Sequence, residues 1–189
     1  MPNLLTPPGR TEPVPENLAD LLIAHDHGII TANLLGLSRH LLPRARLQRN
    51  WSLQERLRGA GFCLLRLPGV LPGPGHSSTE EDLVYVALDL RDRNTLQENL
   101  IRLAREFDQS QVILCRRGLP LREIQLAEGP PVAIEQPGRP HLLATQQLVY
   151  NGTLLACHDA PEWLPCPGNW ISRLACAVIA RKDWRGLTV

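Results

Sequence analysis

Residues 83–115, LVYVALDLRDRNTLQENLIRLAREFDQSQVILC, decide the fold, because a strand, a helix and a second strand follow one another there. Leu83 to Leu88 is apolar at every position, which is typical of a central strand covered on both faces. Leu96 to Phe107 carries apolar residues at i, i+4, i+7 and i+11, the stripe of an amphipathic helix. Gln111 to Cys115 is again apolar and predicts the second strand.

The residues before this stretch predict the same order of elements. Ile29 to Ala32 is a short β-branched strand, residues 44–59 read as a helix, and Phe62 to Leu67 is a further strand. The combined order is β-α-β-β-α-β, so we expect an α+β, ferredoxin-like core with both helices on one face of a four-stranded antiparallel sheet.

Local signals place the element boundaries. Ser52 with Glu55, and Thr95 with Glu98, have the spacing of capping boxes, so we expect a helix start at Thr95 and a start or restart at Ser52. Residues 148–155 form a hairpin signal around Asn151-Gly152, because both residues tolerate the positive φ of a type I′ turn.

Three segments make up the chain. Residues 1–15 contain five prolines and predict an extended, proline-rich arm. Residues 16–189 are expected to form a single α+β domain, with its core at about 28–116 and a β-rich extension at 117–189.

Composition restricts the class of protein. The chain has 189 residues, is 43% hydrophobic and carries a formal net charge of +1, an ordinary globular balance. It holds no apolar run long enough to span a membrane and no signal-peptide pattern. The five cysteines are an odd number, so we expect reduced thiols in a cytoplasmic protein, with Cys63 and Cys115 acting as small buried hydrophobes.

One set of residues resembles a known pattern. Ile30-Thr31-Ala32-Asn33 is followed by Arg49, Leu53, Leu57 and Gly61, then by Glu81 and by Asp108-Gln109. Over residues 29–116 this is similar to a small bacterial domain family of unknown function, with an I-T-A-x-N start and an N-x-x-R-x3-L-x3-L-x3-G helix. Arg46 stands where that pattern has asparagine. The resemblance implies an intracellular bacterial origin and no assigned activity, and we expect a protein of bacterial, phage or mobile-element origin.

Arginines gather on the first predicted long helix, and only Glu55 opposes them. The candidate residues for binding nucleic acid or a partner are Arg39, Arg44, Arg46, Arg49, Trp51 and Arg56. Guanidinium groups bind phosphate, and an exposed tryptophan stacks on a base. The alternative is a solvated helix face with Trp51 packed in the core.

Other polar clusters lack the spacing that catalysis or metal binding needs. His25-Asp26-His27 suits a polar helix end as well as a metal site. Cys157, Cys166 and Cys176 lack a tight Cys-x2-4-Cys pair. Asp82 and Asp89 would lie about 23 Å apart along one strand, too far to share a metal ion. We expect no metal and no cofactor.

Function follows from these exclusions. We expect a non-enzymatic accessory, adaptor or inhibitor protein that binds a protein partner, with Trp163, Trp170 and Trp184 as candidate exposed anchors. The alternative is that these tryptophans are buried in the core, where this residue type is more often found. Two alternatives are a nucleic-acid-binding or RNA-processing protein that uses the arginine helix, and an enzyme with a His or Cys site around His25, His27 or Cys157.

Overall fold

The computed structural model describes residues 18–33, 41–69, 82–117, 119, 121–126, 129–136, 141–142, 148–150, 153–156 and 162–164. The helices there are α1 (Leu18–Ala24), α3 (Pro43–Gly59) and α4 (Leu96–Glu106). The strands are β1 (His27–Thr31), β2 (Cys63–Gly69), β3 (Asp82–Leu88), β4 (Gln111–Cys115), β5 (Leu121–Gln125), β6 (Val132–Gln136), β7 (His141–Leu142), β8 (Leu148–Tyr150), β9 (Thr153–Ala156) and β10 (Glu162–Leu164). The protein is therefore a mixed α and β structure.

One antiparallel sheet joins the strands of the described part of the chain. Its order is β6-β5-β4-β1-β3-β2-β9-β8-β7, with β10 also paired to β2. Between residues 27 and 115 the chain runs β1, α3, β2, β3, α4, β4. The centre of the sheet is β1 and β3, which pair in the register Ile30 to Tyr85.

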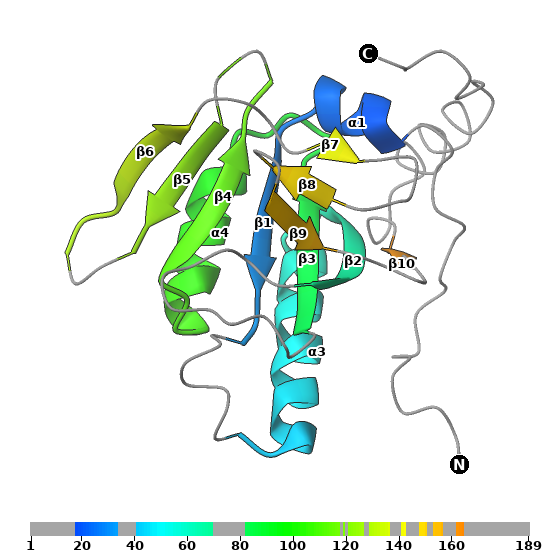
Figure 1. The fold of residues 1–189 in the computed structure, drawn as a ribbon, viewed down its shortest axis with the longest axis vertical. Coiled ribbons are helices and arrows are strands. Elements are labelled where there is room, and N and C mark those ends of the chain that lie inside the picture. The colour runs from blue at the N-terminus through cyan, green and yellow to red at the C-terminus, as the bar shows by residue number, and fades with distance from the viewer. Residues whose placement is uncertain are drawn as a thin grey trace.

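The helices α3 and α4 cover one face of the sheet (Figure 1). Alternate strand residues point to this face, among them Ile30, Tyr85 and Leu114, and they form one buried cluster with the apolar stripes of both helices. Each fully buried leucine of such a cluster contributes about 1.5–3 kcal/mol. The stripe at Leu96, Leu100 and Leu103 was predicted from its spacing and is buried.

The opposite face of the sheet is buried as well. Ile29, Leu65 and Val86 point to it and pack in a second cluster with Leu21 of α1. Strand β7 is the last strand of the sheet, and four strands separate it from β1. It nevertheless contacts α1, the helix that directly precedes β1 in the chain. The sheet therefore curls back over this face, and Figure 1 shows β8 and β9 in front of β1 and β3, with β7 beside α1.

Trp163 belongs to this second cluster and is completely buried. Its strand, β10, pairs with β2 in the register Trp163 to Leu65. The prediction of Trp163 as an exposed anchor was wrong, because a strand that was not predicted carries this side chain into the core. Trp170 and Trp184 lie outside the described residues.

Two details of the helices also differ from expectation. Helix α3 runs without interruption from Pro43 to Gly59, so no helix starts at Ser52. Pro43 stands at the helix start, where its fixed φ fits and its missing N–H costs nothing. Thr95 is the N-cap of α4, as predicted, but its side chain makes no capping hydrogen bond.

Candidate functional site

The arginines of α3 were the predicted binding residues, and the structure separates them into two groups. Arg39 lies outside the described residues. Arg44 is exposed, and Arg46 and Trp51 are half-buried along the first half of the helix. The guanidinium groups of Arg49 and Arg56 are held in intramolecular contacts, so the described residues of this set do not form one continuous basic face.

Arg49 connects three parts of the fold. Its Nε donates to the carbonyl of Ala32 at 3.1 Å, just after β1, and an Nη atom donates to the carbonyl of Phe107 at 2.7 Å, at the end of α4. The same guanidinium lies 3.6 Å from Asp108 and 5.5 Å from the centre of the Phe107 ring. Arg49 is therefore a structural clamp between β1, α3 and the turn before β4.

Arg56 and Arg58 are paired on the outside of α3. Arg56 lies 2.7 Å from Glu106 of α4, and Arg58 lies 3.4 Å from Glu55. Sequence analysis counted only Glu55 against the arginines, because Glu106 is fifty residues further along the chain. These pairs remove most of the local charge imbalance that suggested a nucleic-acid surface.

The polar residues of the resemblance gather at the same end of the sheet. Asn33 and Gln109 are buried beside Arg49. The Asn33 amide donates to Asn50 Oδ1 at 3.3 Å, and the Gln109 amide donates to the Phe107 carbonyl at 2.9 Å. Glu81 lies outside the described residues.

A second buried polar layer follows on the helix-facing side. The Tyr85 hydroxyl donates to the Asn50 carbonyl at 3.0 Å, and Arg66 donates to Gln54 Oε1 at 3.4 Å. Burial lowers the pKa of Arg66, while the neighbouring Tyr85 acts in the opposite direction. Sequence analysis missed this layer, because Arg66 and Tyr85 stand inside apolar strands.

The histidine candidates lie at the start of β1. His27 Nδ1 donates to the His25 carbonyl at 3.2 Å, and His25 lies 3.6 Å from Asp92. Among the described residues, no three His, Cys, Asp or Glu side chains stand where they could share a metal ion. Asp89 is buried and accepts the backbone N–H groups of Arg91 and Arg93, which makes it a turn-forming residue.

The cysteines differ from the expectation of reduced thiols. Cys63 is buried but disulfide-bonded, so it is not the simple apolar residue that was predicted. Cys115 is a buried thiol. Cys157, Cys166 and Cys176 lie outside the described residues.

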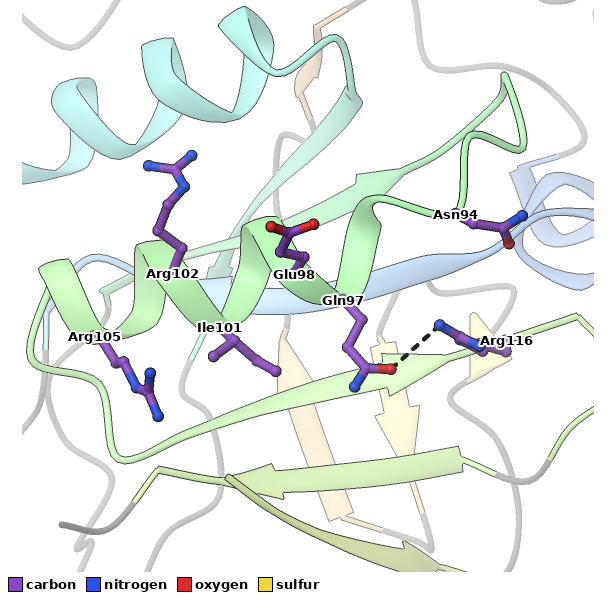
Figure 2. A pocket seen from close by; sticks show the side chains of 7 residues that line it. All are labelled: Asn94, Gln97, Glu98, Ile101, Arg102, Arg105 and Arg116. Carbon is purple, nitrogen blue, oxygen red and sulfur yellow. Dashed lines mark hydrogen bonds between the residues drawn. The ribbon is translucent and has the colours of Figure 1, made fainter. Parts of the chain in front are cut away.

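A groove on the outer side of α4 is the strongest candidate site. It has a volume of about 720 Å³ and is open to solvent. Figure 2 shows its lining side chains on α4, on the loop before it and at the end of β4. These residues are Asn94, Gln97, Glu98, Ile101, Arg102, Arg105 and Arg116.

Within the part of the chain that the structure describes, the charge of this groove is positive and partly uncompensated. Arg105 donates to the carbonyl of Gly129 at 3.2 Å, and Arg116 donates to Gln97 Oε1 at 3.3 Å, so neutral acceptors hold both groups. Arg102, by contrast, lies 3.8 Å from Glu106. Guanidinium groups held in this way are oriented without losing their charge, which suits them to bind carboxylate or phosphate. Sequence analysis did not identify them, because Arg105 and Arg116 belong to different elements.

Compared with known proteins, the chain matches no family model, no curated protein sequence and no solved structure. The similarity of residues 29–116 to a bacterial domain family therefore stays a prediction. None of the helices in the described part of the chain has the length and apolar character needed to cross a membrane.

Proposed function

We propose that this protein is a non-enzymatic adaptor or accessory protein that binds a protein partner through the groove on α4. The single observation behind the proposal is the pair of oriented and uncompensated guanidinium groups, Arg105 and Arg116, in an open groove. The proposal includes a core of the ferredoxin-like class, supported by the strand order β4-β1-β3-β2 with α3 and α4 on one face.

The burial of both faces of the central strands favours a protein partner over RNA. Ferredoxin-like RNA-binding modules stack bases on aromatic side chains of an open sheet face. Here Leu65 and Val86 of that face are buried in one cluster with Trp163 and with Leu21 of α1. Arg49 and Arg56 are engaged in intramolecular contacts, which leaves less charge on α3 for binding a nucleic acid.

The chemistry of the described residues favours binding over catalysis. The groove contains one carboxylate, Glu98, and lacks a nucleophile. A general acid–base pair or an activated nucleophile requires a second titrating group within hydrogen-bond reach. The groove offers hydrogen-bond donors and charge, which are the means of recognition rather than of bond cleavage.

The experiment is affinity purification from the source cells with the wild type and two variants, each with and without nuclease. We expect a stoichiometric, nuclease-resistant protein that is lost in the double variant Arg105→Glu/Arg116→Glu and retained in Arg58→Glu, whose site lies on α3. Binding is then reconstituted with the purified partner. Material that disappears on nuclease treatment, or that the double variant still binds fully, would refute the proposal.

A cytoplasmic location is also proposed, and Cys63 provides its test. Structural disulfides are rare in a reducing cytoplasm, so the disulfide at Cys63 counts against this location. Cells are lysed in acid to stop thiol exchange, the precipitated protein is denatured at neutral pH with an alkylating reagent, and the Cys63 peptide is identified by mass spectrometry. A cytoplasmic protein shows alkylated Cys63, whereas unlabelled Cys63 contradicts the location.

A further inference from the structure

The groove on α4 has a regular layout along the helix. Gln97, Ile101 and Arg105 are spaced at i, i+4 and i+8, so they lie on one face of α4. In Figure 2 all three point towards β4, and Arg116 reaches Gln97 at one end of this row. The row therefore begins with a cation, passes an apolar side chain and ends with a second cation.

The helix sets the distance between the two cations. Arg116 is held by Gln97, which lies eight residues before Arg105 on α4. Eight residues of α-helix advance about 12 Å along the axis, so this is the approximate separation of the two positions. An extended peptide advances about 13 Å in four residues, and its alternate side chains point to the same side. Residues i, i+2 and i+4 of such a peptide match the three positions of the groove.

The order of chemistry in the groove selects among anionic ligands. Carboxylates at positions i and i+4 would meet Arg116 and Arg105, and an apolar residue at i+2 would meet Ile101. A nucleic-acid strand carries a phosphate at every nucleotide. It would therefore also place charge beside the apolar side chain of Ile101.

We propose that the groove binds an extended protein segment of the pattern acidic-x-apolar-x-acidic. This inference rests on the proposed function and specifies the ligand of the same site. The two carboxylates each take one guanidinium, and the segment lies along α4 between Arg116 and Arg105. Recognition depends on the spacing of the two charges as well as on their sign.

The test is fluorescence anisotropy with labelled, end-capped peptides in which Gly-Ser flanks surround a variable centre. The first centre is ESLSE, the second is ELESS, with the same composition and a shorter charge spacing, and the third is ESSSE, without the apolar residue. We expect ESLSE to bind at least about tenfold more tightly than ELESS, which corresponds to about 1.4 kcal/mol. Equal affinity for ESLSE and ELESS would overturn the inference.

Variants connect the peptide to the groove. Arg105→Gln/Arg116→Gln is expected to lower the affinity for ESLSE at least about tenfold, and Arg58→Gln is the matched control with unchanged affinity. Circular dichroism and the melting temperature verify that each variant is folded. An unchanged affinity in the double variant would place the peptide elsewhere and refute the inference.

A single-stranded oligonucleotide provides the last comparison, together with the purified cellular partner. Tighter binding of the oligonucleotide than of ESLSE, lost in the double variant, would overturn both the inference and the proposed function. A cellular partner that needs Arg105 and Arg116 while all three peptides bind equally would overturn the inference alone.

Discussion

At the scale of single residues, Arg49 shows how a predicted binding residue becomes part of the framework. Its donors satisfy two carbonyls that end β1 and α4, at 3.1 Å and 2.7 Å. Hydrogen bonds from charged donors contribute about 1.5–3 kcal/mol each in buried positions. The guanidinium is partly exposed, so we take the lower part of this range.

Arg49→Met is expected to lower the free energy of unfolding by about 2–3 kcal/mol, because both hydrogen bonds of the guanidinium are lost and the Phe107 carbonyl keeps only the Gln109 amide. Arg49→Lys restores only part of the loss, since an ammonium group cannot reproduce the fork of donors. Arg56→Gln is the control, with a change of at most about 1 kcal/mol expected for its exposed ion pair. Urea denaturation measures all three. A fully stable Arg49→Met protein would return Arg49 to the list of candidate binding residues.

Gly28 gives a second test at this scale. A Cβ atom added there would clash with Leu100 Cδ1 and would lie 3.1 Å from the Ile113 carbonyl oxygen, so α4 packs directly on the backbone of β1. Gly28→Ala is expected to destabilise the protein by about 1–3 kcal/mol through overpacking. Gly59→Ala meets no atom within 4 Å and stands in α3, where alanine favours the helix by up to about 1 kcal/mol. Thermal unfolding should show a lower melting temperature for Gly28→Ala and a higher one for Gly59→Ala. A shift of both melting temperatures in the same direction would contradict this account.

Sequence analysis succeeded where a residue's role depends on its own neighbours. The burial of Leu100 followed from helical spacing, and the strand at Gln111 to Cys115 was predicted with the bounds it has. It failed where the role depends on a distant partner. Glu106 neutralises Arg56 from another helix, and Trp163 is buried by a pairing almost one hundred residues away along the chain.

At the scale of elements, short strands carried the least signal. β10 has three residues and β7 has two, and no periodicity can be read over such lengths. The hairpin of β8 and β9 was predicted nonetheless, because the sequence Asn151-Gly152 favours a tight turn. In the structure, Tyr150 of β8 pairs with Thr153 of β9. Turn chemistry is therefore informative even where the strands themselves are not.

β10 is expected to be essential to the second face of the sheet. Trp163 is fully buried against β2, so Trp163→Ala should lower the free energy of unfolding by about 3–5 kcal/mol. Trp51 is only half-buried on α3, and Trp51→Ala should cost clearly less. Guanidinium denaturation followed by circular dichroism compares the two. An equal or smaller loss at Trp163 would contradict the packing of β10.

At the scale of the whole molecule, the covering of both faces of the central strands determines which surfaces can bind. One face lies under α3 and α4, and the other lies under α1 and the returning strands. The open groove on α4 is therefore part of the outer helix layer rather than of the sheet. The groove could not be predicted from the sequence, because hydrogen bonds to neutral acceptors distant along the chain orient Arg105 and Arg116.

The net charge of the chain makes salt dependence a sensitive test of this site. The formal charge is only +1, so long-range attraction of an anionic partner is weak and the groove itself determines the response to salt. Two guanidinium contacts predict a loss of affinity of about tenfold or less between about 50 and 200 mM salt. A nucleic acid held by many phosphates loses about a thousandfold or more over the same range. The affinity for ESLSE, measured across this range, should therefore fall only slightly, and still less in Arg105→Gln/Arg116→Gln. A steep loss, unchanged in the double variant, would mean that the charges that bind this ligand lie outside the groove.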